Sequence, residues 1–376
     1  MKRIAIVGGG IAGLATAIFL RRRGVEVAVY ERAPAFAPVG AGILLSPNAL
    51  AVLDAIGLSE GALAAGVPLE EFSVTDLSLE PYQRLSVEWC RERFGHGLVT
   101  LRRSDLHAVL AAGLGDGVVR LGKDLTSLEA TRDGVRLAFA DGSWATADQV
   151  LGADGLRSRV RSSLFGEVPL RYSGQTSFRA LVPFELPAPW ARTGIEIWGG
   201  TFRFGFASTT PNEVYYFCVV VQPPGTSCFS DDARGWISEG LKGFPPIVRE
   251  LVAATPAEAL LQTDIYDFKP IPRWSVGPVG LIGDAAHAAT PNLGQGGAQA
   301  LEDAYYLDAC VDEPSGGIDL DRFHRRRRRK TARITSQSYL FGRLAHAHRF
   351  VGLRDLILRA TPRSMTLRQT ASIYRL

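Results

Sequence analysis

The chain has 376 residues, with 42 Lys and Arg against 38 Asp and Glu, a formal net charge of +4, and 46% hydrophobic residues. These values exclude disorder along the whole chain, and the length predicts two or three domains with a large buried core. The four cysteines are too widely spaced for a zinc module or a disulfide framework, which favours a reducing cytosol. They are Cys90, Cys218, Cys228 and Cys310.

The N-terminus imitates a signal peptide, because Lys2 and Arg3 precede an uncharged run that ends at Leu20. Four glycines interrupt that run and Arg21–Arg23 closes it, so we expect no export. No other segment approaches the roughly 20 apolar residues that a membrane helix needs. We therefore expect a cytoplasmic protein that does not act at a membrane.

The first thirty or so residues have the pattern of a doubly wound parallel sheet. Ile4–Val7 is a short apolar run, typical of a strand buried on both faces. Ile11–Arg23 then predicts a helix, and Val25–Tyr30 predicts a second strand.

A glycine cluster separates the first strand from the first helix, and Gly8–Gly13 fits the pattern GxGxxG. In such a turn the first glycine permits the bend, the second lets backbone approach a pyrophosphate, and the third packs helix against strand. The helix N-terminus attracts the anion. Glu31 follows the second strand, where a carboxylate accepts hydrogen bonds from ribose hydroxyls. These features predict a dinucleotide site for FAD or NAD.

Further along, Arg103–Leu114 predicts a helix, and short strands follow as far as Gln149–Leu151. From about Ser173 the pattern changes to alternating, aromatic-rich strands. They predict an antiparallel sheet, which forms a second domain inserted into the first. The four segments are Thr176–Phe184, Gly194–Trp198, Thr201–Ala207 and Glu213–Gln222.

Val279–Ile282 returns to the buried-strand pattern and leads into Gly283-Asp284, a glycine-rich loop and a helix over Gly297–Cys310. A strand-end aspartate can bind a polyol, and the loop amides with the helix dipole can stabilise negative charge. A helix cap with a tight turn is the structural alternative. The chain from about Asp319 predicts helices.

Within the inserted sheet, alternation along 202–206 puts three phenylalanines on one face and Arg203 on the other. A buried guanidinium needs a partner. A hairpin with its turn near 208–212 would bring Tyr215 opposite Arg203, and a register shift of one residue would bring Tyr216 there instead.

An Arg–Tyr pair of this kind could orient a carboxylate, an enolate or a urate-like oxygen, although a satisfied surface pair is the alternative. Arg179, on a neighbouring predicted strand, is a further candidate for contact with the substrate.

Three segments in this order resemble the fingerprint of the single-component FAD-dependent aromatic hydroxylases: Gly8–Gly13 with Glu31, Gly152–Ser158, and Gly283-Asp284. Salicylate, p-hydroxybenzoate, 6-hydroxynicotinate and urate hydroxylases belong to this family. The resemblance covers essentially the whole chain, including Gly40–Asn48 and Arg103–Leu106.

The resemblance implies FAD contacts that run from the pyrophosphate to the flavin ring. They are Gly8, Gly10, Ile11, Ala12 and Gly13 at the pyrophosphate, Glu31 and Arg32 at the adenosine, Arg103 and Asp284 at the ribityl region, and Gly42, Gly294, Gly296 and Gly297 beside the flavin. Pro291 would lie near the reacting edge of the flavin. Asp154 belongs to a segment that serves FAD and the nicotinamide cofactor in the family, or else forms a structural turn with a buried ion pair.

For the substrate, the urate-hydroxylating relatives carry an arginine and a tyrosine at the spacing of Arg203 and Tyr215. They also carry an acid where this chain has Asn292, a departure that argues against urate. The resemblance thus implies Arg203, Tyr215 and Pro291 at the reacting centre, without naming the substrate.

The resemblance also implies the chemistry. NADH or NADPH reduces FAD, O₂ forms a flavin hydroperoxide, and its distal OH is transferred to a small aromatic or heteroaromatic compound, by hydroxylation or epoxidation. The chain has no second GxGxxG, which fits a family whose nicotinamide cofactor has no Rossmann domain of its own. The alternative is an FAD-dependent dehydrogenase or reductase of the same fold. We expect a monomer or homodimer, and no metal.

The predicted fold class is α/β: a Rossmann-type FAD-binding domain with an inserted antiparallel β-sheet substrate domain and C-terminal helices. The FAD-binding domain would comprise 1–71, 98–170 and 271–376, and the substrate domain 72–97 and 171–270. The basic run 325–330 suggests a nucleic-acid or membrane patch. Because such a run covers every side of a helix, we interpret it as a solvated or packed helix and expect no nucleic-acid partner.

Overall fold

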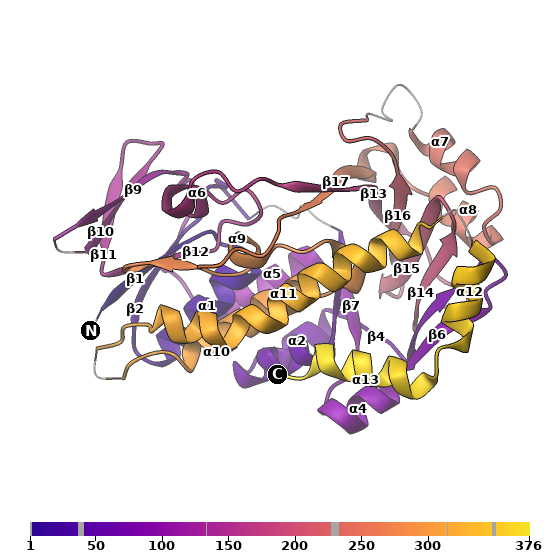
Figure 1. The fold of residues 1–376 in the computed structure, drawn as a ribbon, viewed down its shortest axis with the longest axis horizontal. Helices are drawn as coiled ribbons and strands as arrows, with labels where there is room; N and C mark the ends of the chain where they lie inside the picture. Colours follow the sequence, from indigo (N-terminus) through magenta and orange to yellow (C-terminus); the bar gives the residue numbers. More distant parts are fainter. Residues whose placement is uncertain (1, 37–40, 133, 227–232, 314, 348–350) are drawn as a thin grey trace.

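The computed structural model describes residues 2–36, 41–132, 134–226, 233–313, 315–347 and 351–376. Gly40 of the family-like segment and Cys228 lie outside these ranges. Figure 1 shows two groups of strands, and the long helix α11 (Leu320–Ala345) extends from one group to the other.

A six-stranded sheet holds the N-terminal strand at its centre, in the order β18-β19-β12-β1-β2-β8. Its pairs are parallel except β18–β19, as the short apolar runs predicted. Ile4, Ile6 and Val7 are buried in the main hydrophobic core. The strands are β1 (Arg3–Val7), β2 (Glu26–Tyr30), β8 (Val119–Arg120), β12 (Gln149–Gly152), β18 (Ser275–Val276) and β19 (Val279–Leu281).

Helices and two small sheets pack around this sheet. The predicted helices over 11–23, 103–114 and 297–310 form, with α1 packed against α10. The helices are α1 (Ile11–Arg22), α2 (Pro47–Ala55), α3 (Ser59–Ala64), α5 (Arg103–Leu114), α6 (Arg159–Phe165), α9 (Asp284–His287) and α10 (Gly296–Asp308). The small sheets are β3 (Gly42–Leu45), β7 (Val99–Arg102) and β4 (Gly66–Pro68), and β11 (Trp144–Ala147), β10 (Gly134–Phe139) and β9 (Leu125–Thr131).

A seven-stranded sheet forms the inserted part, in the order β17-β13-β16-β15-β14-β5-β6. It is antiparallel as predicted, except that β14 pairs with β5 in parallel. No hairpin sets the direction of β5 against β14, because β5 enters from an earlier part of the chain. The strands are β5 (Glu71–Thr75), β6 (Pro81–Ser86), β13 (Arg171–Pro183), β14 (Thr193–Gly199), β15 (Phe202–Thr210), β16 (Glu213–Val221) and β17 (Leu261–Asp267).

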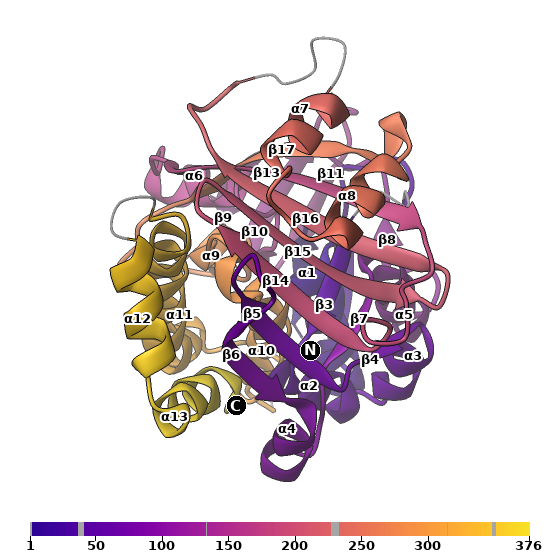
Figure 2. The ribbon, with the colours of Figure 1, turned by 90° about the vertical axis from the view of Figure 1, so that its right-hand side faces the viewer.

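The two faces of this sheet have different neighbours (Figure 2). Phe178, Phe204 and Tyr216 on one face form a second core with Ile237 and Val248 from the covering helices. The opposite face looks toward the six-stranded sheet. Besides η1 (Ala257–Ala259), the helices of this part are α7 (Ala233–Gly240), α8 (Pro246–Ala253) and, after β6, α4 (Val87–Phe94).

The C-terminal helices include the arginine run. Arg327 on α11 is 1% exposed and its guanidinium pairs with Glu302 and Asp303 of α10. The interpretation of the run as a packed helix is therefore confirmed. The chain continues with α12 (Val351–Ala360) and α13 (Arg363–Tyr374). Within the described part of the chain, no helix is long and apolar enough to cross a membrane.

Candidate active site

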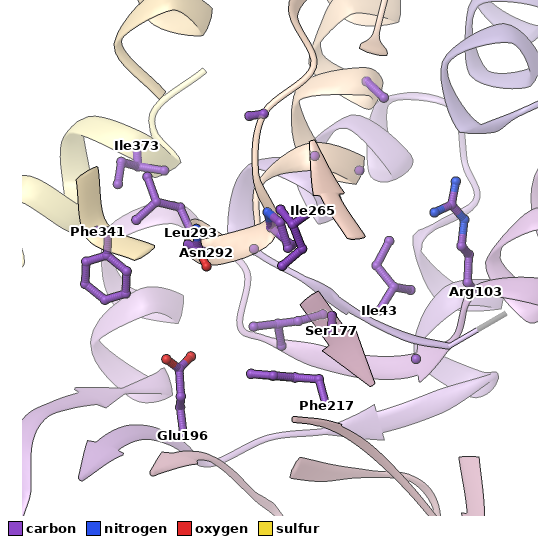
Figure 3. Close-up of a pocket in the computed structure, with 18 of the residues that line it drawn as sticks. Ile43, Arg103, Ser177, Glu196, Phe217, Ile265, Asn292, Leu293, Phe341 and Ile373 are labelled. Atoms are coloured by element: carbon purple, nitrogen blue, oxygen red, sulfur yellow. The ribbon is translucent and has the colours of Figure 1, made fainter. Parts of the chain in front are cut away.

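One large cavity, of about 1340 Å³, lies between the two large sheets. Side chains from both sides of it are visible in Figure 3. All site residues predicted from the sequence line this cavity except Gly13 and Tyr216. Those that line it are Gly8, Gly10, Ile11, Ala12, Glu31, Arg32, Gly42, Arg103, Asp154, Arg179, Arg203, Tyr215, Asp284, Pro291, Gly294, Gly296 and Gly297.

The GxGxxG turn has the backbone geometry that requires its glycines. Gly8 has a φ of 109°, and a Cβ there would clash with the carbonyl group of Ala153. A Cβ on Gly13 would clash with the carbonyl oxygen of Gly8. These contacts match the expected roles of the first and third glycines. Gly13 therefore supports the cavity wall from behind.

Backbone amides hold the Glu31 carboxylate at the end of β2. Its Oε2 accepts from the Gly9 amide at 2.6 Å and its Oε1 from the Ala33 amide at 2.9 Å. The Nε2 of His107, on α5, donates to the Gly9 carbonyl oxygen at 2.6 Å. Sequence reasoning missed His107, because a single histidine within a predicted helix belongs to no recognisable motif.

Three glycines leave open space in the cavity where another residue would place a side chain. A Cβ at Gly10, Gly294 or Gly296 would meet no atom of the described chain within 4 Å. Gly10 is the N-cap of α1 and Gly296 begins α10, so two helix N-termini open onto the same cavity. Helix N-termini attract anions. Asp284, exposed at this wall, adds a carboxylate that can accept from hydroxyl groups.

On the opposite wall, the predicted β15–β16 hairpin forms in a different register. Arg203 pairs with Val219, and Tyr215 pairs with Ala207. The prediction that Tyr215 or Tyr216 lies opposite Arg203 is wrong. The strand β15 extends past its predicted end, with a bulge before a tight turn, and this moves the centre of the hairpin toward the C-terminus.

Arg203 points into the cavity and is 2% exposed. Its Nη2 donates to Oδ1 of Asn292 at 2.5 Å, and its Nη1 lies 3.2 Å from Oε1 of Glu196. That same oxygen accepts from the indole Nε1 of Trp198 at 2.7 Å. Sequence reasoning missed Glu196, although it lies on a predicted strand where an acidic residue interrupts an apolar run. The polar cluster therefore carries a cation, an anion and an amide.

Tyr215 lines the cavity, and its ring packs so closely on β3 that a Cβ on Gly42 would clash with it. Burial raises the pKa of Tyr215 to about 12, although Arg179 and Arg103 act in the opposite direction. The phenol therefore keeps its proton at neutral pH and can donate a hydrogen bond. Arg179 lines the same wall, and its Nη2 donates to the Thr263 hydroxyl at 3.0 Å.

Tyr216 faces away from the cavity, so its prediction as a substrate residue is wrong. Its hydroxyl lies 2.9 Å from the Thr255 hydroxyl, and its ring stacks on Phe204 with centroids 4.9 Å apart. Alternate residues of a strand point to opposite faces, and Tyr215 already occupies the cavity face.

Comparisons with known proteins address the identity of this cavity. The family model described as FAD binding domain matches residues 1–222 and 262–338. The chain belongs to the FAD-dependent aromatic hydroxylases. It is 34% identical to an aurachin C monooxygenase/isomerase of Stigmatella aurantiaca, over 91% of this chain and 89% of the relative. It is 37% identical to a 3-amino-4-hydroxybenzoate 2-monooxygenase of Streptomyces cremeus, over 84% and 79%.

Among solved structures, the fold is similar to that of Klebsiella pneumoniae HpxO complexed with FAD and uric acid. The TM-score is 0.90 at 26% identity, over 99% of this chain and 96% of that one. The protein is thus an FAD-dependent monooxygenase that uses NAD(P)H and O₂. The α/β fold class and the main functional prediction are confirmed, and the dehydrogenase alternative is not favoured.

The cavity fits FAD on its own geometry. The open space beside Gly10 and the N-terminus of α1 suit a pyrophosphate, and Glu31 stands at the end of the neighbouring strand. Arg103 and Asp284 offer a cation and a carboxylate along the same cavity. This sequence of groups matches the charges and hydroxyls of the cofactor from its adenosine to its ribityl chain.

Asp154 has a structural role at this cavity wall. Its Oδ1 accepts from the Ser158 hydroxyl at 2.5 Å, and its Oδ2 accepts from the amides of Arg159 and Val160 at 2.7 and 3.1 Å. The carboxylate thus caps α6, which agrees with the structural-turn alternative. A contact with FAD remains a prediction.

A buried charge network supports the segment that carries Asp284. The Asp303 carboxylate accepts from the Gly283 amide and from Nε of Arg327, both at 2.7 Å, and lies 2.6 Å from Nε2 of His287. Burial acts to raise the pKa of Asp303, but His287 and Arg327 lower it to about 2. The interpretation of His287 as a structural histidine is confirmed.

A second network joins the start of α2, within the family-like segment, to the glycine-rich loop before α10 and to α10 itself; we call this loop, residues 288–295, the flavin loop. The Nδ2 of Asn48 donates to Oε1 of Gln295 at 3.1 Å and to Oε1 of Glu302 at 2.6 Å. The Nε2 of Gln295 donates to the Ser46 hydroxyl at 3.1 Å. The loop that would face the flavin is thereby fixed from both sides. Sequence reasoning missed Gln295 because a lone amide in a loop carries no pattern.

Proposed function

We propose that this monooxygenase hydroxylates a small aromatic or heteroaromatic ring that carries a hydroxyl or ring N–H group, and not a ring held by its carboxylate. The cluster of Glu196, Arg203 and Asn292 is the observation that carries the proposal. Glu196 already balances the charge of Arg203 inside the cavity wall. A carboxylate bound at Arg203 would therefore lie beside a second carboxylate, which costs several kcal/mol.

The cluster can instead pair with a neutral polar group. Arg203 carries N–H donors at Nε and Nη1 that have no hydrogen-bond partner among the described residues. The Asn292 amide N–H groups, in contrast, already donate to Thr290 and Ser338. Glu196 supplies an acceptor that faces the cavity (Figure 3). A ring hydroxyl or N–H can donate to Glu196, and a ring carbonyl can accept from Arg203. Tyr215 is our proposed third contact, because its phenol keeps its proton.

Pro291 directly precedes Asn292 of this cluster, and both Pro291 and the N-terminus of α10 line the cavity. We assign Pro291 to the reacting centre, and the amides of Gly296 and Gly297 to negative charge on the cofactor. When bound, FAD supplies the transfer of electrons from NAD(P)H and of oxygen to the ring. The protein groups position the ring and keep water out.

The overall reaction balances as follows: a ring C–H becomes C–OH, the second oxygen atom leaves as water, and NAD(P)H with one proton supplies the two electrons and two hydrogens of that water. We keep NADH and NADPH as alternatives, and epoxidation as the alternative outcome at the ring.

The test uses purified holoenzyme, NADH or NADPH, ¹⁸O₂ and matched ring pairs such as 4-hydroxyquinoline and quinoline-4-carboxylate. We expect the hydroxylated ring to stimulate NAD(P)H oxidation at least about tenfold more, with one ¹⁸O atom in the product. Stronger stimulation by the carboxylates would overturn the proposed substrate class. Conversion of all O₂ to H₂O₂ with every ring would favour the dehydrogenase alternative.

Glu196→Gln sharpens the same test, because it removes the negative charge beside Arg203. We expect the ratio of kcat/KM for the carboxylated ring over the hydroxylated ring to rise about tenfold or more. Tyr216→Phe is the matched control, since Tyr216 faces the other core, and it should leave the ratio unchanged. An unchanged ratio in Glu196→Gln would show that Glu196 does not select the substrate.

We further propose a cytoplasmic protein that acts as a monomer or homodimer and has no nucleic-acid partner. The inward pairing of Arg327 with Glu302 and Asp303 supports the last point. Light scattering of the holoenzyme measures the assembly, and DNA affinity that falls steeply with salt would contradict the proposal.

A further inference from the structure

The cavity continues beyond the flavin loop, between the β5–β6 hairpin and helices α11 to α13. In Figure 2, β5 and β6 stand on one side of this region, and α12 and α13 on the other. None of the predicted FAD contacts lies in this part. Its apolar lining includes Val74, Tyr82, Phe341, Ile357, Leu358 and Ile373.

The exposed fraction of the lining side chains differs between the inner and the outer part of this region. Val74, Leu358 and Ile373 are each 8% exposed, whereas Ile357 and Met365 line the same cavity at 58% and 60% exposure. The lining therefore leads from a buried apolar interior to an apolar mouth. Large exposed apolar side chains gathered at the rim of a cavity mark a place where an apolar group binds.

Specific contacts hold the two walls together. The Arg359 guanidinium on α12 pairs with Asp76, next to β5, and lies 5.1 Å from the centre of the Tyr82 ring on β6. On α13, the Tyr374 ring meets Phe94 of α4 edge-on, with centroids 5.9 Å apart. These contacts fix α12 and α13 against the β5–β6 hairpin and α4, so the two walls of the passage are held in place.

We propose that this passage, the apolar channel, takes a hydrocarbon chain attached to the ring of the substrate. The inference rests on the proposed function, because a ring at Glu196 and Arg203 would direct a substituent toward the channel. In Figure 3, Phe341 and Ile373 lie on the side of Asn292 that is opposite Arg103. The chain would thus extend away from the FAD side.

The lining selects the chemical class of this chain. Burying methylene groups against Val74, Leu358 and Ile373 is favourable, whereas a charged chain would lose its hydration there. The exposed Arg84 and Arg363 and the polar Thr361 and Gln369 also line the cavity, and they suit the outer part, which meets water. In the buried part of the channel, an alkyl or isoprenyl chain therefore fits better than a peptide, a sugar or an anionic group.

The test measures binding separately from turnover. Holoenzyme is titrated with 4-alkylphenols from methyl to hexyl, and the dissociation constants are read from the perturbation of the FAD absorbance. We expect affinity to rise about two- to fourfold for each added methylene group. Equal dissociation constants across the series, or no binding of the hexyl compound, would overturn the channel.

Ile357→Asp places a charge at the channel mouth at an exposed position, so the fold should tolerate it. We expect the dependence of affinity on chain length to fall by at least half. Leu356→Asp is the matched control: Leu356 is the neighbouring residue, is 64% exposed and does not line the cavity. It should keep the wild-type dependence. The same loss in both variants, or in neither, would overturn the assignment.

The experiments distinguish an incorrect channel assignment from an incorrect proposed function. Chain-dependent binding without hydroxylation of any homologue supports the channel and overturns the proposed function. Hydroxylation of all homologues with chain-independent affinity overturns the channel and leaves the proposed function standing.

Discussion

The side of the cavity that we assign to FAD, the FAD wall, presents mainly backbone, whereas the side that we assign to the substrate, the substrate wall, presents side chains. Glycines and the N-termini of α1 and α10 contribute to the first, and backbone amides hold one of its carboxylates, Glu31. The second depends on Glu196, Arg203 and Asn292, which reach one another from two strands and a loop.

This difference predicts which substitutions impair each wall. A wall made of backbone loses its ligand when an added side chain occupies the ligand's space, but the stability of the fold is retained. A wall of buried charges fails when one partner is removed, because the remaining charge destabilises the fold. The variants below separate these two kinds of failure.

The largest effect is expected at the substrate wall. Glu196→Leu leaves Arg203 buried without its ionic partner and should lower the free energy of unfolding by about 3–5 kcal/mol. The double variant Glu196→Leu/Arg203→Leu should recover most of that loss. Urea unfolding measures both values, and a double variant as unstable as the single one would contradict the ion-pair explanation.

At the FAD wall, Gly10→Val should abolish cofactor retention while preserving the fold. Its side chain would occupy space that is open beside the N-terminus of α1, and FAD affinity should fall on the order of a hundredfold. FAD absorbance after gel filtration and far-UV circular dichroism measure the two properties. Gly13→Val is the comparison, since its Cβ would clash with Gly8 and destabilise the fold. A Gly10→Val protein with full FAD content would refute the backbone-wall description.

The third effect depends on pH and concerns His346, the C-cap residue of α11, whose Nε2 donates to the Val219 carbonyl oxygen at 3.2 Å. Burial, followed by the charge of Arg203, lowers the pKa of His346 to about 4. The unfolded chain, with a His pKa near 6.5, therefore takes up the proton first as the pH falls. The free energy of unfolding should fall on the order of 1 kcal/mol per pH unit from about pH 6.5 to pH 4.

Urea unfolding of wild type and His346→Gln between pH 7 and pH 4.5 measures this contribution. We expect the variant to lose most of the pH dependence in that interval. The same slope in both proteins would assign the pH dependence to other groups. Asp303, whose pKa is lowered to about 2, contributes only below about pH 4.

The smallest effect is expected on the face of the seven-stranded sheet that is turned away from the cavity. Tyr216→Phe removes the hydrogen bond to Thr255 and should cost about 1 kcal/mol of stability. Tyr215→Phe should instead lower kcat/KM with little change in stability, since Tyr215 lines the cavity. Equal kinetic losses in the two variants would break the distinction between the two faces.

The sequence predicted the strands, turn and helices of the FAD wall well, because their determinants are local. Gly8, Gly13 and Glu31 are specified by spacing along a strand, a turn and a helix, and the structure forms each of these elements. The helix Arg103–Leu114 also forms over the predicted residues. Such signals need no knowledge of partners that are distant in sequence.

The substrate wall was predicted less completely, because it depends on pairing between strands. A bulge and a tight turn at the end of β15 moved the partner of Arg203 from Tyr215 to Val219. Glu196 and Asn292 meet Arg203 only after β14 packs beside β15 and the loop folds over them. No spacing rule contains this information.

The order in which strands join the two large sheets has a consequence for biosynthesis. The seven-stranded sheet takes strands from 71–86, 171–221 and 261–267, and β19 joins the six-stranded sheet only at 279–281. Neither sheet can acquire all of its strands until most of the chain has left the ribosome. A nascent chain stopped before residue 261 would expose unpaired strand edges, and such edges promote aggregation. Cofactor capture is therefore a late event, because the amides at the start of α10 emerge after both sheets.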